Sequence, residues 1–188
     1  MDTLLCVKTS PPDNRRSRFE DLAGEVYEPI QRYLRRRANI DQVDDLVVDV
    51  MTVLWKRLDD VPAGAALPWA YAVARRCLSN TRRANARRLR LIRKLETERP
   101  IRDREPPGLD VELEEALESL PTDQEEILRL WAWEQLEASE IATVLGCSAN
   151  AASIRLHRAR RALKSAMERK TTTVDGHTRV EHTEEERS

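Results

Sequence analysis

The sequence has little of the chemistry that enzymes, secreted proteins and membrane proteins depend on. Among 188 residues there are five glycines, one phenylalanine and three cysteines. Cys6, Cys77 and Cys147 are isolated and lack C-x-x-C spacing, which argues against disulfides and favours a reducing cytosol. No apolar run approaches the ~20 residues that span a membrane, and no signal-peptide core is visible. We therefore expect a cytoplasmic protein.

Motifs for catalysis and metal binding are also missing. His157, His177 and His182 have no nucleophile or carboxylate partner at motif spacing, and there is no glycine-rich phosphate loop. A zinc pair of Cys147 and His157 would need more ligands than the region offers. The sequence predicts no enzyme activity, no cofactor and no metal site.

What is abundant favours helices. Alanine, leucine, arginine and glutamate are frequent and few stretches alternate with the period of a strand, so the predicted class is all-α. The net charge of −1 conceals blocks of opposite sign. Arg15–Arg99 and Arg155–Lys170 are basic, whereas Asp103–Glu140 is mostly acidic. The alternation indicates two surfaces for nucleic acid separated by an acidic stretch.

The pattern predicts two small helical domains. We expect a disordered arm over 1–17, a first domain over 18–98, a linker over 99–109, a second domain over 110–170 and a disordered tail over 171–188. The linker is predicted from its prolines and glycine, Pro100 and Pro106-Pro107-Gly108. We expect it to be extended and mobile, so that a protease cuts there first and releases two folded pieces.

Three helices are predicted in the first domain. The first covers Phe19–Arg37 with a kink at Pro29, and the second begins near Asp44 and breaks at Val61-Pro62-Ala63-Gly64. Pro68 suits the first turn of the third, which ends in a run of arginines. The predicted apolar positions of the first helix are Phe19, Leu22, Val26, Ile30 and Tyr33 or Leu34. Those of the second are Leu46, Val47, Val50, Val53, Leu54 and Leu58, and those of the third are Ala70, Val73, Ala74, Cys77 and Thr81.

The second domain contains the most informative stretch. After a helix for which Thr122 and Glu125 predict a capping box, Glu140–Leu163 reads as helix, turn and basic helix. Gly146 suits the left-handed residue that stops a helix, and Ser148 suits the N-cap of the next one. In that second helix the predicted buried stripe is Ala152, Leu156, Ala159 and Leu163.

The opposite side of this helix is polar and cationic. Asn150, Ser153, Ile154, His157 and Arg161 lie on the outward stripe, and Arg155, Arg158, Arg160 and Lys164 flank it. A helix packed on one side with such residues on the other suits entry into a DNA major groove between two phosphate strands. The alternative is an ordinary helical hairpin with a solvated basic face.

Three motifs carry a family resemblance. Leu120-Pro121 and the following acidic helix, with Glu140-Ile141-Ala142, Leu145-Gly146-Cys147-Ser148 and Arg155–Arg160, resemble sigma region 4. Asp44-Asp45-Leu46-Val47, with Asp49 and Trp55, resembles region 2.2, and Leu67-Pro68-Trp69-Ala70 to Arg83 resembles regions 2.3 and 2.4. In this order they resemble an RNA polymerase sigma factor of the extracytoplasmic function (ECF, group IV) type. The helix-turn-helix alone also resembles LuxR-type regulators.

The resemblance implies a partner or ligand for each motif. It implies that the Asp44–Asp59 helix docks on the β′ clamp of core RNA polymerase, and that promoter DNA is read at the −10 and −35 elements. Polymerase-binding residues are then Asp45, Val48, Asp49, Thr52, Trp55 and Lys56; −10 residues are Trp69, Arg75, Arg76, Ser79, Asn80, Arg82, Arg83 and Arg87; −35 residues are Ser148, Asn150, Ser153, Ile154, Arg155, His157, Arg158, Arg160 and Arg161. The family also implies an anti-sigma factor as partner.

Two departures from the family and several alternatives remain at this stage. Ala151-Ala152-Ser153 stand where members often have Thr-Val and a cation, and Val48 stands where Gln is frequent. The acidic face can simply be solvated, Trp55 can fill the core, and Trp69 and Tyr71 can pack against the first two helices. The whole chain can also be a helix-turn-helix regulator that never joins polymerase, or a helical adaptor that binds only protein.

Overall fold

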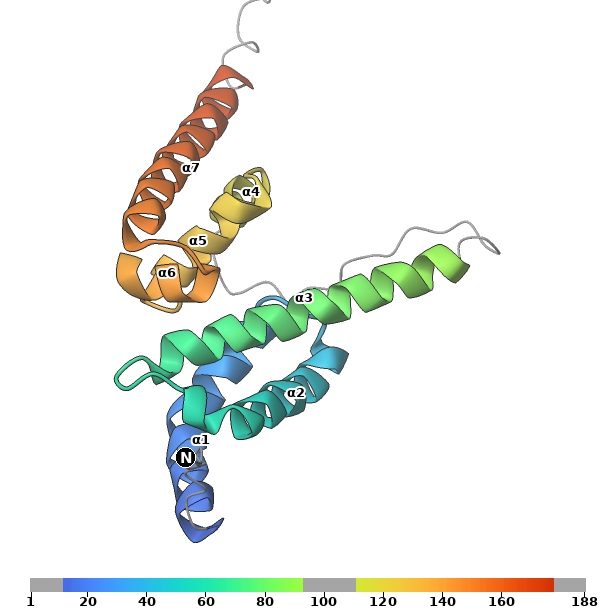
Figure 1. Cartoon of the computed structure of the whole chain (residues 1–188). Helices are drawn as coiled ribbons and strands as arrows, with labels where there is room; N and C mark the ends of the chain where they lie inside the picture. The colour runs from blue at the N-terminus through green and yellow to red at the C-terminus, as the bar shows by residue number, and fades with distance from the viewer. Residues whose placement is uncertain (1–11, 93–110, 178–188) are drawn as a thin grey trace, which may run out of the picture. The chain divides into compact units, whose positions relative to one another are not determined.

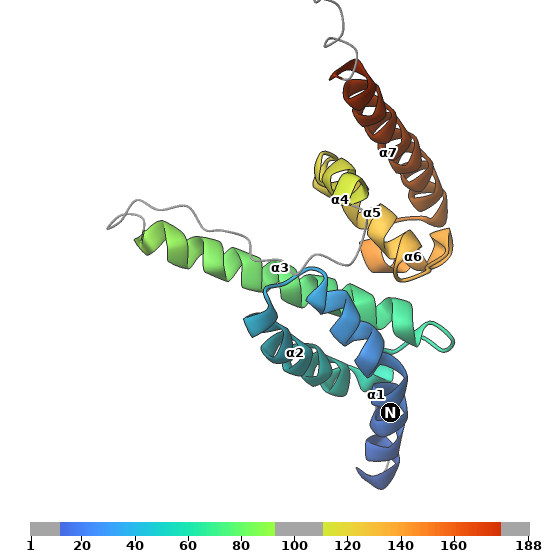
Figure 2. The same cartoon turned by 180° about the vertical axis from the view of Figure 1, so that it is seen from behind.

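The computed structural model describes residues 12–92 and 111–177, and these residues form helices without strands, as the composition predicts. The helices divide into two compact units, one on either side of residues 93–110. The predicted linker, most of the predicted arm and the end of the predicted tail lie outside the described residues. Figures 1 and 2 show the helices of each unit from two sides.

The first unit is built from α1 (Pro12–Arg35), α2 (Val43–Lys56) and α3 (Ala66–Ile92), with short 3-10 turns at Ile40–Gln42 and Leu58–Asp60. Each of the three long helices packs against the other two. The predicted apolar stripes meet in the middle of the unit and bury Val26, Ile30, Tyr33 and Leu34, Leu46, Val50 and Leu54, and Ala70, Val73 and Ala74. The apolar spacing therefore predicts most of this core. Leu78 is buried although it was not predicted, and Phe19, Val53, Cys77 and Thr81 are only half-buried.

The ends of α1 differ from the prediction. The helix begins at Pro12, so that residues 12–17, expected in the disordered arm, are helical. It continues through Pro29 to Arg35, and its ribbon bends in both views (Figures 1 and 2). An ion-pair cluster accounts for the extra turns. Arg15 and Arg18 both reach Asp59, in the 3-10 turn that follows α2, at 2.7 and 2.9 Å.

The second unit is built from α4 (Val111–Glu118), α5 (Thr122–Ala132), α6 (Ala138–Leu145) and α7 (Ala149–His177). α7 packs against each of the other three helices. The sequence pattern did not predict α4. The tail was expected from Thr171, whereas α7 continues to His177.

The capping box was assigned to the wrong helix. At the start of α5, Pro121 is the N-cap and makes no side-chain bond, and Thr122 is already the first helical residue. The capping box of this unit lies on α6, where the backbone N–H of Glu137 donates to the Glu140 carboxylate at 2.8 Å. Glutamate at the N-cap lies outside the usual Ser/Thr pattern of a capping box, which explains why the sequence did not reveal it.

A buried arginine joins α4 to α5. Arg129 is only 2% exposed, and its Nη2 lies 2.9 Å from carboxylate oxygens of both Glu114 and Glu125. Its guanidinium also lies 5.4 Å from the centre of the Trp133 ring. A buried cation with two carboxylates holds its neighbours in one arrangement, and removal of one partner leaves the others desolvated without compensation.

We expect Arg129→Ala to destabilise the second unit by about 3–5 kcal/mol, because two largely buried carboxylates then face each other. Urea unfolding of the full chain, followed by circular dichroism, measures this. Arg16→Ala, which removes an exposed ion pair with Glu20, is the matched control and leaves the transition unchanged. Equal midpoints for the two variants would contradict the assigned role of Arg129.

Candidate nucleic-acid interface and docking groove

The turn between α6 and α7 is built as the sequence predicts. Gly146 has φ 66° and ψ 42°, the left-handed conformation that ends a helix at little cost only in glycine. The Ser148 hydroxyl oxygen then accepts the backbone N–H of Ala151 at 3.2 Å and caps α7. Together these two residues fix the direction in which α7 leaves α6.

Alanines form the buried side of α7. Ala152 and Ala159 are completely buried and Ala166 nearly so, while Leu156 and Leu163 are half-buried. Because alanine is short, the backbone of α7 can approach the other helices of the unit closely. The predicted stripe is correct, and it turns the opposite side of the helix to solvent.

The nine residues predicted to bind the −35 element are all exposed. They are Ser148, Asn150, Ser153, Ile154, Arg155, His157, Arg158, Arg160 and Arg161. Eight of these lie at the N-cap, on the outward side of α7 or on the flank that carries Arg155 and Arg158. The ninth, Arg160, has a neighbour that the sequence did not indicate.

Arg160 lies against α5. Its guanidinium is 4.6 Å from the ring centre of Trp131. Leu128, Leu163 and Met167 lie beside this pair, and the five side chains belong to the lining of an open groove of about 370 Å³. Trp131 and Met167 belong to different helices, and spacing within one helix could not show that the two meet.

The residues predicted to bind the −10 element separate into two groups on α3. Trp69, Arg76, Asn80, Arg83 and Arg87 follow one another at 7, 4, 3 and 4 residues, which places them on one outward stripe. Trp69 is half-buried and the other four are exposed. Arg75, Ser79 and Arg82 lie to one side of this stripe.

Arg82 and Tyr71 take part in the packing of the first unit. The Arg82 Nη2 donates to the backbone carbonyl of Arg37 at 2.7 Å, just after the end of α1, where carbonyls lack helical partners. Tyr71 is buried, and its ring centre lies 5.2 Å from that of Tyr33. For Tyr71, packing against the first helix is therefore the correct alternative. Trp69 keeps an exposed part and lies 5.6 Å from the Arg57 guanidinium.

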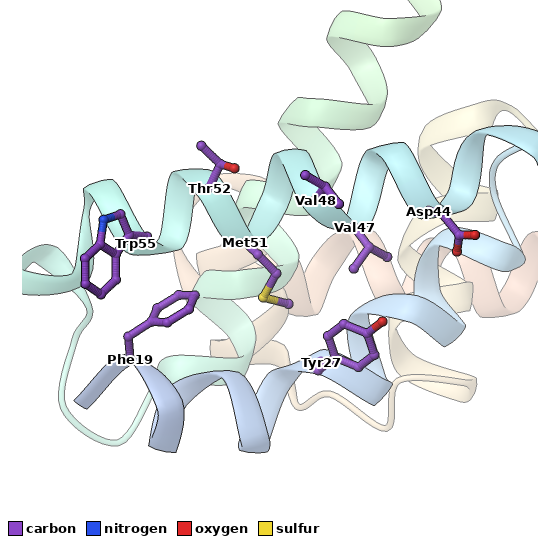
Figure 3. A pocket seen from close by; sticks show the side chains of 8 residues that line it. All are labelled: Phe19, Tyr27, Asp44, Val47, Val48, Met51, Thr52 and Trp55. Carbon is purple, nitrogen blue, oxygen red and sulfur yellow. The ribbon is translucent and has the colours of Figure 1, made fainter. Parts of the chain in front are cut away.

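A groove lies between α1 and α2 (Figure 3). It has a volume of about 400 Å³ and is lined by Phe19, Tyr27, Asp44, Val47, Val48, Met51, Thr52 and Trp55. In the close view Phe19 and Tyr27 rise from α1 towards α2, and Met51 points from α2 towards α1. The contribution of α1 was not predicted. Tyr27 was missed because it falls outside the buried stripe of its helix.

All six residues predicted to bind polymerase are exposed on α2. Val48, Thr52 and Trp55 line the groove, whereas Asp45, Asp49 and Lys56 follow at four- and seven-residue spacing beside it. Val48 is 64% exposed and Trp55 is 41% exposed. Trp55 is not fully buried in the core, but its ring does contact Phe19 edge to face, with the ring centres 5.2 Å apart.

The extra turns of α1 fix one end of this groove. Arg15 donates to the backbone carbonyl of Trp55 at 2.8 Å, and its guanidinium lies 5.3 Å from the Trp55 ring centre. Hydrogen bonds from Arg18 and Arg15 lower the pKa of Asp59 below its ordinary value. The stabilisation from these bonds is thus present above the unfolded-state pKa of the carboxyl and is lost as the pH falls through its lowered folded-state pKa.

Within residues 12–92 and 111–177, no three His, Cys, Asp or Glu side chains are grouped to hold a metal ion. Cys77 and Cys147 are free thiols. Burial and then the negative charge of Asp49 raise the pKa of Cys77, which keeps it in the unreactive thiol form at neutral pH. Among the same described residues, no helix is both long and apolar enough to cross a membrane.

We expect Asp59→Asn to release the first turns of α1, because both arginine ion pairs end on this carboxylate. Trypsin should then cut after Arg15, Arg16 or Arg18 several times faster than in the unchanged protein. Asp60→Asn is the control, since Asp60 pairs only locally with Arg57 among the interactions described here. Equal cleavage rates in the two variants would show that Asp59 does not hold this segment.

Comparison with known proteins agrees with this geometry. The family model for sigma-70 region 4 matches residues 110–163, which include the helix-turn-helix. No curated protein matches the chain in sequence.

Two solved structures share the helical fold of the chain. The sigma factor RpoE from Bartonella quintana, solved in complex with the anti-sigma factor NepR, is 22% identical with a TM-score of 0.60, over 80% of this chain and 96% of RpoE. CnrH, solved in complex with the cytosolic domain of CnrY, is 25% identical with a TM-score of 0.54, over 80% of this chain and 87% of CnrH. The chain thus contains a segment that matches sigma-70 region 4, and its helices share the fold of these two proteins.

Proposed function

We propose that the chain binds core RNA polymerase and directs it to promoters. In this proposal the α1–α3 unit docks on the β′ clamp and recognises the −10 element, and the α4–α7 unit recognises the −35 element. The observation that carries the proposal is the occurrence, in one chain, of a region 4 helix-turn-helix and a second unit with both a docking groove and an arginine stripe.

The −35 assignment is supported by the division of α7 into two sides. One side is held in the core by Ala152 and Ala159, and the other presents polar side chains and arginines to solvent. Recognition helices enter the major groove with their N-terminal residues on base edges and their cations on phosphates. In this proposal the exposed Arg155 and Arg158 hold phosphates, whereas Arg160 also stacks on Trp131.

The −10 assignment is supported by the stripe on α3. Trp69 offers part of an aromatic face, and Arg76, Asn80, Arg83 and Arg87 follow it along the outward side. Unpaired bases stack on aromatic rings, and arginines hold the phosphates of a single strand. An aromatic residue in line with cations therefore suits melted DNA better than a closed duplex.

The polymerase assignment is supported by the combination of charge and apolar surface on α2. Asp45 and Asp49 provide carboxylates that steer association and fix register with a basic partner. Beside them, Val48 and Trp55 offer exposed apolar surface at the groove. Buried apolar and aromatic anchors supply most of the affinity of an interface. The face thus has both components of a specific docking surface.

We also propose a protein partner that holds the chain inactive. RpoE was solved with an anti-sigma factor, and CnrH was solved with the cytosolic domain of CnrY. An anti-sigma factor that covers the surfaces for polymerase or DNA would act on this chain in the cytoplasm, where transcription takes place.

The decisive experiment is reconstitution with core RNA polymerase, followed by run-off transcription on a genomic library. A sigma factor gives discrete transcripts only when it is added to the core enzyme. A regulator that binds DNA but never joins polymerase would fail to co-purify with the core enzyme in a pull-down. A protein-binding adaptor would in addition lack the steep salt dependence of DNA binding that phosphate contacts produce.

We expect reversal of both charges in Asp45→Arg/Asp49→Arg to weaken binding to core polymerase by at least tenfold, a loss of about 1.4 kcal/mol. The reason is that two cations then face the basic surface that the carboxylates are proposed to meet. Titration of labelled protein with core enzyme measures the affinity. Asp21→Arg/Glu25→Arg, two exposed acids on α1 outside the groove lining, should bind as the unchanged protein does.

We expect a division of roles on α7 between Arg158 and His157. Arg158→Ala should weaken binding to all −35 sequences alike and reduce the slope of log affinity against log salt by roughly one. His157→Ala should change the preferred base, at a cost of about 1–3 kcal/mol for the favoured site. Salt titrations and base-substituted duplexes separate these effects. The opposite result would mean that the two sides of the helix have been assigned the wrong way round.

A further inference from the structure

Ile154 is a large apolar side chain on the outward side of α7, and it is 45% exposed. It comes two residues after Ala152 and five before Ala159, so helix geometry places it opposite the buried stripe. Its exposed neighbours on that side are Asn150, four residues earlier, and His157, three residues later. An apolar residue therefore stands in the middle of the polar surface that faces DNA in the proposed function.

Exposure of one isoleucine decides nothing by itself, because single apolar side chains are common on protein surfaces. The position is what matters. Ile154 lies in the first two turns of α7, the part of a recognition helix that reaches base edges. Ala149, Ala151 and Ser153 around it are short, so the helix can come close to the floor of the groove. The isoleucine side chain is itself short, so it can touch a base only when the helix lies this close.

The chemistry of the major groove then limits the possible contact. Guanine, cytosine and adenine present donors and acceptors along that edge, whereas thymine also presents its C5-methyl group. Isoleucine has no donor or acceptor, so placing it over a polar edge would strip water from the base without replacing the hydrogen bond. Over a thymine methyl it instead buries apolar surface on both partners.

We propose that Ile154 reads the C5-methyl group of one thymine in the −35 element. The inference rests on the proposed function and deepens it by naming the chemical group that this residue recognises. Asn150 and His157, about one turn away on either side, then contact the base edges next to that thymine, and Arg158 reaches the backbone. This contact provides base recognition at a place where Ala151 and Ser153 offer no long polar side chains.

Replacement of thymine by deoxyuridine tests the contact, because it removes the methyl group and leaves every donor and acceptor in place. The preferred duplex is first selected with the full-length protein at low salt. Each thymine in it is then replaced in turn, and affinity is measured by fluorescence anisotropy. We expect one replacement to weaken binding about fourfold, the effect of losing one buried methyl. At that position 5-methylcytosine should bind better than cytosine.

Ile154→Ala identifies the residue responsible. This variant should bind the thymine and uracil duplexes equally, and it should remain folded because alanine favours helix. Met167→Ala removes another exposed apolar side chain of α7, one that lines the groove beside Trp131, and should keep the fourfold difference. Persistence of the difference in Ile154→Ala, or no sensitive thymine at any position, would overturn the inference.

The same experiment separates failure of the inference from failure of the proposed function. Sequence-selective binding without any sensitivity to uracil contradicts only the role of Ile154. If instead the protein binds all duplexes equally, or none, then recognition of the −35 element by α7 is itself wrong and the inference falls with it.

Discussion

Close packing of α7 through alanine is the constraint on which the second unit depends. Ala152 and Ala159 are fully buried, and α7 contacts every other helix of its unit, so a larger residue at either position would push the helix outward. Gly146 and Ser148 set the angle at which α7 begins. The side of α7 that is left to solvent, and with it the proposed DNA surface, follows directly from this packing.

The first unit repeats the same division on α2. Leu46, Val50 and Leu54 hold the helix in the core, and the remaining positions carry acids together with the exposed Val48 and Trp55. Here the surface is completed by a second element. Phe19 and Tyr27 of α1 supply the other wall of the groove, and Arg15 and Arg18 fix its end through Asp59. The proposed docking surface thus lies on two helices, whereas the proposed −35 surface lies on α7 alone.

Several arginines of the described residues have structural roles. Arg129 is buried between Glu114 and Glu125, Arg82 donates to a carbonyl after α1, and Arg160 lies on Trp131. Sequence position alone does not distinguish these from Arg76, Arg83 or Arg158, which extend from outward surfaces. A count of cations along a helix therefore overestimates the number that are available to phosphates.

The sequence by itself determined the helical class, most of the core of the first unit and the helix-turn-helix, because these depend on local periodicity and on residues such as Gly146 and Ser148 with special backbone preferences. It predicted the ends of helices less well. Residues 12–17 are helical and not disordered, and they carry ion pairs to Asp59 that the sequence did not indicate. At the start of α5 the N-cap is Pro121 and not Thr122. Only the tertiary structure showed that Tyr27 lines the groove between α1 and α2, that Tyr71 packs against Tyr33 and that Arg160 lies on Trp131. Those outcomes depend on contacts between helices, and the spacing of residues within one helix carries no information about them.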